Sequence, residues 1–247
     1  MAKNLVVLYG KKSIHERLKS NPSTIRKIFV EEGFDDPAIL GLARKHKIKL
    51  EQAFQWKIKE MKAGRNVQGI VAKVEPFVYT PFKRLLAEYS VQRYSLIFLD
   101  GIDDPHNLGV IIRSLSCFGG FGIVLPEQGA CKINETAMHV AVGGENHIHA
   151  SLVPNMHVAL SEAKQEGFTI TGCIPDTHLP DSKAQLIYET DIQPPAGIVL
   201  GAEHRGLDKS ILHLFDQKIY IPTPGADLSL NITIACAIVC SEIMRKY

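Results

Sequence analysis

The sequence predicts an α/β fold in which residues 95–247 form a parallel sheet and a smaller α/β unit precedes them. Three observations support this prediction. Short apolar runs alternate with helical patterns in both parts of the chain. The pattern weakens over residues 76–94, which contain Pro76 and Pro81. Polar residues gather directly after several of the later apolar runs, as they do where an open sheet binds ligands at the carboxyl ends of its strands.

The first 75 residues are predicted to form a small alternating α/β unit. Apolar runs predict strands over 5–9, 27–30, 48–50 and 69–74, and helical patterns cover 13–19, 37–47 and 54–61. Residues 76–94 are predicted to be a linker with a helical stretch at 83–87. We therefore expect a first domain over 1–75, a linker over 76–94 and a second domain over 95–247.

The second domain is predicted to be a doubly wound parallel sheet, because strands and helices alternate along it. The predicted strands are 95–100, 122–126, 168–174, 197–201 and 218–222. The predicted helices are 107–118, 134–142, 155–166, 208–215 and 228–245. The run Gly143–Asn146 receives no role.

Charge is distributed unevenly, although the formal net charge is only +2. Residues 1–75 carry 16 Lys and Arg against 8 Asp and Glu, and the rest of the chain has an acidic balance of −6. A basic first domain favours a polyanionic partner such as RNA. The alternative is a solvated lysine-rich surface with no such partner.

Composition narrows the class of protein further. No run of about 18 apolar residues predicts a membrane helix, and the first residues lack the apolar core of a secretory signal. The five cysteines are scattered, so we expect reduced thiols, no zinc or other metal site and a cytoplasmic location. Neither GxGxxG nor GxxxxGK[ST] follows a predicted strand, which excludes the usual nucleotide-binding loops.

Three polar segments follow predicted strands and are expected to converge at one edge of the sheet. The first holds Asn107 and Arg113, the second Gly201 and Glu203, and the third begins near Ile221 and includes Ser229 and Asn231. Glycine- and proline-shaped backbone suits a small ligand such as adenosine. Other interpretations stay open: Glu203 in a solvated turn, and Ser229 and Asn231 as helix caps.

These segments resemble the three motifs of the SpoU/TrmH branch of the SPOUT RNA methyltransferases. The matching runs, in the family's order, are Asp-Pro-His-Asn-Leu-Gly-x-x-x-Arg-Ser at 104–114, Gly-Ala-Glu-x-x-Gly-Leu at 201–207, and Ile-Pro-x-x-Gly with Ser-Leu-Asn at 221–231. The first domain also resembles that branch, through Tyr9-Gly10, Ile14-His15 and Gln68–Ala72, which look like its ribosomal-protein-like RNA-binding module. The resemblance is greatest to the RlmB-type enzymes.

The resemblance implies a fold, a reaction and a site. It implies a C-terminal trefoil knot in the sheet domain, a homodimer packed through the last helix, and S-adenosylmethionine (AdoMet) as methyl donor to a ribose 2′-hydroxyl. The residues matching the family's catalytic positions are Arg113, Asn107, Glu203, Ser229 and Asn231. Those matching its cofactor positions are Leu200, Gly201, Ile221 and Leu230.

RNA contacts are expected from basic residues in the loops of the first domain and from one arginine in the second motif. These are Lys11, Lys12, Arg44, Lys45, Lys62, Arg65 and Arg205. The leading hypothesis is 2′-O-methylation of large-subunit ribosomal RNA, plausibly at a guanosine. The alternatives are the same reaction on transfer RNA, and a ribosome assembly factor that binds RNA without chemistry. The presence of all five catalytic-type residues favours an enzyme.

Overall fold

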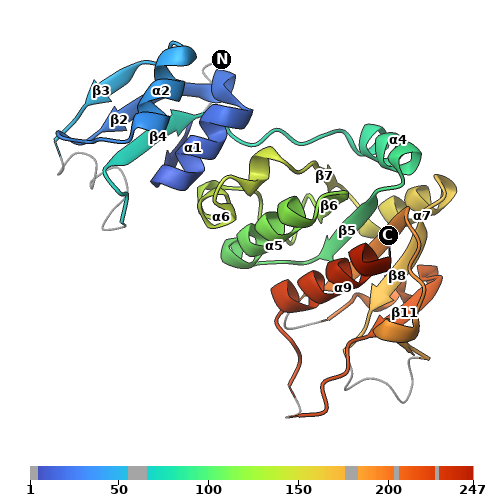
Figure 1. Cartoon of the computed structure of the whole chain (residues 1–247). Coiled ribbons are helices and arrows are strands. Elements are labelled where there is room, and N and C mark those ends of the chain that lie inside the picture. The colour runs from blue at the N-terminus through green and yellow to red at the C-terminus, as the bar shows by residue number, and fades with distance from the viewer. Residues whose placement is uncertain (1–4, 55–65, 176–182, 203–205, 226–227, 247) are drawn as a thin grey trace. The chain divides into compact units, whose positions relative to one another are not determined.

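The computed structural model describes residues 5–54, 66–175, 183–202, 206–225 and 228–246. The chain divides into two compact units (Figure 1). Unit 1 comprises Met1–Val78 together with Ile133–His147, and unit 2 comprises Tyr79–Lys132 together with Ile148–Tyr247. Unit 1 is therefore built from two stretches of sequence that are far apart.

Unit 1 contains a four-stranded mixed sheet in the order β1-β4-β2-β3. Its strands are β1 (Val6–Tyr9), β2 (Ile25–Val30), β3 (Leu50–Gln52) and β4 (Ile70–Val74), and its first helices are α1 (Lys11–Ser20) and α2 (Pro37–Lys45). Helix α1 buries Ile14 and Leu18, and α2 buries Ile39 and Ala43. A second core cluster contains Tyr9, Phe29, Ala53, Val67 and Val71. The predicted helix at 54–61 lies almost wholly outside the described residues.

The second stretch of unit 1 holds α6 (Glu135–Ala141) and a 3₁₀ turn, η2 (Gly144–Asn146). The carboxylate of Glu135 accepts a hydrogen bond from the N–H of Val7 on β1 at 2.6 Å. The His139 ring stacks on Tyr9 with centroids 3.7 Å apart and planes inclined by 17°. Helix α6 is thereby fixed to strand β1, an attachment that the predicted division at residues 75 and 95 did not include.

Unit 2 contains a seven-stranded sheet in the order β7-β6-β5-β10-β8-β11-β9. Its strands are β5 (Ser95–Asp100), β6 (Phe121–Pro126), β7 (Ala150–Val153), β8 (Thr169–Cys173), β9 (Gln185–Leu186), β10 (Ala196–Gly201) and β11 (Gln217–Tyr220). Every neighbouring pair is parallel, which confirms the predicted parallel sheet. Strands β7 and β9 were not predicted, because each is short and β9 contains only two residues.

The helices of unit 2 are α4 (Phe82–Gln92), α5 (Pro105–Phe118), α7 (Met156–Gln165) and α9 (Ile232–Lys246), with 3₁₀ turns η4 (Ile187–Glu189) and η5 (Lys209–Leu214). Leu96 and Phe98 of β5 pack with apolar residues of α4 and α7. The alternate residues Ile97 and Leu99 are also fully buried, so both faces of β5 are covered. Figure 1 shows α5 and α9 side by side, and the two helices are in contact.

Two predicted helices of unit 2 differ from the observed ones. Residues 209–214 form a 3₁₀ turn instead of an α-helix, with the Asp208 side chain accepting from the N–H of Ser210. The last helix begins at Ile232 instead of 228. Asn231 ends the preceding loop because its side-chain oxygen accepts the N–H of Thr233 at 2.8 Å, which caps the helix there.

Candidate active site

The carboxyl ends of β5, β10 and β11 lie at one edge of the parallel sheet, as the sequence predicted. Strand β10 sits between β5 and β8, with Gly201 opposite Asp100 at its end. The strand order reverses between β5 and β10. From β5 the sheet extends through β6 and β7 on one side, and from β10 it extends through β8 and β11 on the other. Such a reversal of strand order creates a crevice outside the carboxyl ends, which is where open α/β sheets bind ligands.

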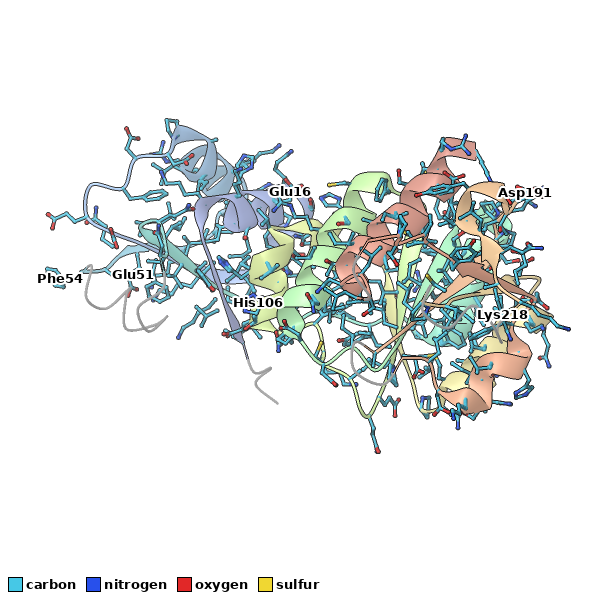
Figure 2. All side chains as sticks on the ribbon, turned by 90° about the horizontal axis from the view of Figure 1, so that it is seen from below. Glu16, Glu51, Phe54, His106, Asp191 and Lys218 are labelled. Carbon is cyan, nitrogen blue, oxygen red and sulfur yellow. The ribbon has the colours of Figure 1, made fainter. Side chains whose placement is uncertain are left out.

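Helix α5 positions the first group of predicted site residues. Gly101 takes a φ of 91°, which a glycine accepts readily, and the chain turns there out of β5. Asp104 then caps the helix by accepting the N–H of His106 at 2.8 Å, and Pro105 occupies its first position (His106 is labelled in Figure 2). Arg113 lies on the exposed side of α5. Within the described part of the chain its guanidinium pairs with no carboxylate, so it is open to an anionic ligand.

Asn107 and Asn231 come together at the start of two packed helices. The amide nitrogen of Asn231 lies 3.5 Å from Oδ1 of Asn107, a separation at the long limit of a hydrogen bond. Asn107 is half-buried, whereas Asn231 and Ser229 are exposed. Asn231 is therefore a helix cap and also a neighbour of Asn107. Ser229 lies outside α9 and does not cap it.

The segment after β10 folds back over the end of its own strand. Ala202 and Gly206 exchange two backbone hydrogen bonds, of 3.1 and 2.9 Å. A Cβ at Gly201 would lie 2.4 Å from the carbonyl carbon of Gly206 and 2.5 Å from the nitrogen of Leu207. The close approach to Gly201 is thus made by the chain itself. Glu203, His204 and Arg205 lie outside the described residues.

The predicted cofactor positions differ in exposure. Leu200 and Ile221 are buried, at 3% and 7%, while Leu230 is 38% exposed. Among the described residues, no backbone–backbone hydrogen bond involves Ile221 or Leu230. Within the described part of the chain, their peptide groups therefore have no backbone hydrogen-bond partner. This arrangement fits an adenosine held by backbone groups, as the family resemblance implies.

The thiols near the site are poor nucleophiles. Burial, helped by the charges of Asp104 and Asp103, raises the pKa of Cys131 to about 11. Burial likewise raises the pKa of Cys173 to about 12. Both thiols are therefore neutral near pH 7, and neither is activated for attack.

The four described RNA-binding candidates of unit 1 were predicted in loops, but they lie instead at the ends of helices. Lys11 and Lys12 begin α1, and Arg44 and Lys45 end α2. Lys12, Arg44 and Lys45 are exposed. Lys11 lies 3.8 Å from the carboxylate of Asp36 and over the ring of Phe34. Lys62, Arg65 and Arg205 lie outside the described residues.

Two sets of residues received no role from the sequence. Asp100 ends a wholly buried strand with an acidic side chain, and the sequence placed it in the predicted strand 95–100 without a functional role. Glu145 and His139 lie in the second stretch of unit 1, and no local sequence pattern links them to α1 or β1. Among the described residues, no group of three or more His, Cys, Asp or Glu is placed to hold a metal ion. No described helix is long and apolar enough to cross a membrane.

Fold and site together define an open α/β sheet protein with its candidate site residues at the switch in strand order. Residues 94–241 match the SpoU rRNA Methylase family, and residues 7–80 match the RNA 2′-O ribose methyltransferase substrate binding family. The chain therefore belongs to the SpoU family of RNA methyltransferases, which use AdoMet as methyl donor.

Individual relatives agree with this assignment. An uncharacterized tRNA/rRNA methyltransferase from Synechocystis is 34% identical over 199 residues, covering 80% of this chain and 50% of that protein. The chain thus spans about half the length of that relative. The 23S rRNA (guanosine-2′-O-)-methyltransferase RlmB of Pseudomonas aeruginosa is 28% identical and covers 97% of this chain and 96% of its own. An AdoMet-bound rRNA methyltransferase from Sinorhizobium meliloti superposes with a TM-score of 0.81 at 21% identity, over 98% of this chain and 87% of that one.

Proposed function

We propose that this protein transfers a methyl group from AdoMet to a ribose 2′-hydroxyl of large-subunit ribosomal RNA. The proposal depends mainly on the position of Arg113. This arginine is exposed, pairs with no described carboxylate and lies on α5, the helix that follows β5. The proposed cofactor segments follow β10 and β11 at the same edge of the sheet. The match of residues 7–80 to an RNA substrate-binding family supports an RNA substrate. The 23S rRNA activity named for the Pseudomonas relative supports ribosomal RNA.

Arg113 is proposed to bind the RNA phosphate next to the reacting ribose. A 2′-hydroxyl is a weak nucleophile until its proton is removed or strongly polarised. Because an arginine is always protonated in proteins, Arg113 is assigned to stabilise the forming alkoxide and not to accept the proton. A backbone phosphate of the RNA would then take that proton. AdoMet, when bound, supplies an electrophilic methyl group, so the protein's main task is to align the two reactants.

The remaining catalytic-type residues are proposed to orient Arg113 and shape the ribose pocket. Asn107 stands on the same helix as Arg113 and close to Asn231, and this contact supports a shared role for the two amides. Ser229 and Glu203 complete the proposed set on the strength of the family motifs. Leu200, Gly201, Ile221 and Leu230 are proposed to hold AdoMet, chiefly through their main-chain groups.

A knotted chain and a homodimer are also proposed. The knot is supported by strand β10 entering between β5 and β8, and by the return of the chain after β11 to pack α9 against α5 and β10. The dimer is supported by apolar side chains exposed on these two helices, with Ile234 50%, Met244 44% and Val110 39% exposed. A partner subunit covering them would bury apolar surface that water now contacts.

The basic first domain is proposed to bind RNA through the lysines and arginines described above. The order of domains proposed from the sequence, RNA-binding before catalytic, agrees with the order of the two family matches along the chain. A cytoplasmic location is also proposed, and it rests on the scattered spacing of the five cysteines in the sequence.

The proposal is tested by mapping 2′-O-methylation across total RNA from cells with and without the gene. Loss of one site in large-subunit ribosomal RNA supports the proposal. Loss of a transfer RNA site would instead favour the alternative substrate, which the tRNA/rRNA name of the Synechocystis relative keeps open. Loss of no site in either RNA would contradict both.

Arg113→Lys and Arg113→Ala test the residue that carries the proposal. Both variants are expected to retain AdoMet affinity within about threefold and to lose more than about 100-fold of methyl transfer, because neither side chain provides the planar fork that binds a phosphate. The exposed Arg84→Ala, on α4, is the matched control. Collapse of AdoMet affinity in the Arg113 variants would make Arg113 a cofactor-site or folding residue.

A further inference from the structure

Asp100 is a nearly buried carboxylate that no part of the proposed mechanism yet uses. It is the last residue of β5 and is only 8% exposed. Its Oδ2 accepts a hydrogen bond from the backbone N–H of Asp208 at 3.0 Å. A buried carboxylate needs such a partner, and a hydrogen bond to a charged acceptor is stronger than one between neutral groups.

The donor belongs to the segment that begins at Gly201, one of the proposed cofactor residues. That segment leaves β10 at Gly201, which lies opposite Asp100 in the sheet, and closes on itself through the Ala202–Gly206 hydrogen bonds. Asp208 is where the closed segment ends and η5 begins. The Asp208 side chain is used separately, because its Oδ1 accepts the N–H of Ser210.

Asp100 therefore links two parts of the candidate site. On one side the chain continues through Gly101 into α5, which carries Asn107 and Arg113. On the other side its carboxylate fixes Asp208, which directly follows the backbone of Gly206 and Leu207. The backbone of Gly206 and Leu207 packs so tightly on Gly201 that even a small displacement of this segment alters the contact.

We propose that Asp100 is a positioning residue, whose carboxylate holds the backbone of Gly206–Asp208 against Gly201 at the sheet edge. Gly201, a proposed cofactor residue, thereby keeps its alignment with Arg113. This inference rests on the proposed function. Asp100 acts through the peptide N–H of Asp208 and is not assigned any contact with the RNA or with the reacting atoms.

Removing the acceptor predicts a defect in cofactor binding. Asp100→Ala leaves the N–H of Asp208 without its partner and should weaken AdoMet affinity about tenfold, which corresponds to about 1.4 kcal/mol. Asp100→Asn keeps an oxygen that can accept the same N–H, so affinity should recover to within about threefold of the unmodified protein. A purely electrostatic role would make the Asn variant as defective as the Ala variant.

The donor can be removed without touching Asp100. Asp208 has a φ of −63°, which proline adopts, so Asp208→Pro deletes the N–H while preserving this backbone angle. Because it also deletes the cap of η5, its reference is Asp208→Ala, which loses the cap but keeps the N–H. Relative to that reference, Asp208→Pro should weaken AdoMet binding about tenfold.

The test uses the full chain, with AdoMet affinity from calorimetry, methyl transfer on RNA from cells lacking the gene, and thermal unfolding. Asp100→Ala combined with Asp208→Pro should be no weaker than the worse single variant, since both remove one hydrogen bond. Additive losses, or an Asp100→Ala variant with unchanged AdoMet affinity, would overturn the inference.

Failure of the inference and failure of the proposed function give different results. If no RNA is methylated by the unmodified protein, the proposed function fails, but the comparison of AdoMet affinities remains interpretable. If Asp100→Ala does not fold, the Asp208→Pro and Asp208→Ala pair still decides the question. Equal AdoMet affinity in those two variants would refute the positioning role while leaving RNA methylation intact.

Discussion

Arg17 and Glu145 form a buried ion pair across 128 positions of sequence, with Nη2 of the arginine 3.1 Å from Oε1 of the glutamate. The two side chains are 5% and 0% exposed. Nη1 of Arg17 also donates to Thr24, and the amide of Asn146 donates to Glu145. Arg17 Nε and Glu145 Oε2 have no hydrogen-bond partner among the described residues. This pair fixes η2 to helix α1 within unit 1.

Arg17→Ala should destabilise unit 1 strongly, because it leaves the carboxylate of Glu145 buried without a counter-charge. Breaking one side of a buried ion pair typically costs about 3–5 kcal/mol, which denaturant unfolding followed by circular dichroism would measure. Arg26→Ala is the matched control. Its ion pair with Glu75 has an arginine that is 56% exposed, and such pairs contribute about 0–1 kcal/mol.

The same variant should show a distinctive pH dependence. Burial raises the pKa of Glu145 above the usual carboxyl value of 4.5, while Arg17 opposes this rise. A raised folded-state pKa favours folding at low pH, and this contribution is lost as the pH rises through it. Without Arg17 the pKa of Glu145 rises further. The deficit of Arg17→Ala should therefore be largest near pH ~8 and shrink toward pH ~5, whereas a constant deficit would mean that Arg17 acts only through packing.

Gly201→Ala should disrupt the segment that follows β10. The added Cβ would lie 2.4 to 2.6 Å from backbone atoms of Gly206 and Leu207, which cannot rotate away as a side chain can. Overpacking of this kind costs about 1–3 kcal/mol, and AdoMet affinity measured by calorimetry should fall at least about tenfold. Gly41→Ala, on α2 of unit 1, is the control, because no described atom beyond the helix itself lies within 4 Å of its Cβ position. Equal affinities in the two variants would contradict the proposed cofactor role of this segment.

Two variants of Asn231 separate its capping role from its contact with Asn107. Asn231→Ala loses the oxygen that accepts from both the N–H and the hydroxyl of Thr233, at a cost of about 1 kcal/mol. Asn231→Asp keeps that acceptor but cannot donate to Asn107. It should therefore unfold within about 2 °C of the unmodified protein, yet transfer methyl groups at least about tenfold more slowly. Full activity of the Asp variant would show that capping is the whole function of Asn231.

Charge reversal should test the basic surface of unit 1. Lys12→Glu combined with Lys45→Glu changes two exposed lysines and should weaken RNA binding. It should also reduce the slope of log affinity against log salt by about 0.7 to 0.9 for each phosphate that the protein no longer neutralises. The control is Lys83→Glu combined with Arg84→Glu on α4 of unit 2. It also replaces two basic side chains, so it changes the net charge of the protein by the same amount. An equal loss of RNA affinity in both double variants would show that the net charge of the protein, and not the basic surface of unit 1, determines binding.

Most elements of unit 2 could be predicted from local pattern. Strand β5 is a run of apolar residues followed by Asp-Gly, and α5 is preceded by Asp104 and begins with Pro105, which cap and start it. These signals act within a few residues, so they are readable in sequence. The start of α9 was less readable, because Ser229 and Asn231 are both good caps and only the side-chain hydrogen bond of Asn231 distinguishes them.

The candidate site was predictable in part, because parallel strands bring the segments after β5, β10 and β11 to one edge. The hydrogen bond between Asp100 and Asp208 was not, since the two residues are 108 positions apart and their contact depends on which strands are neighbours. The order of strands in a sheet depends on the relative stability of many alternative arrangements of the whole chain. The residues around Asp100 and Asp208 do not indicate which arrangement forms. The role of Glu203 stays a prediction.

The sequence alone determined the class of this protein: an α/β chain with a basic first domain and three motifs of an RNA methyltransferase family. Each depends on composition or on residues close together in the chain. Only the tertiary structure decided that residues 133–147 belong with unit 1 and that the Asp100 carboxylate meets the N–H of Asp208. Such long-range contacts are fixed by the burial and pairing of groups that are far apart in sequence, and a linear pattern contains no record of which groups meet.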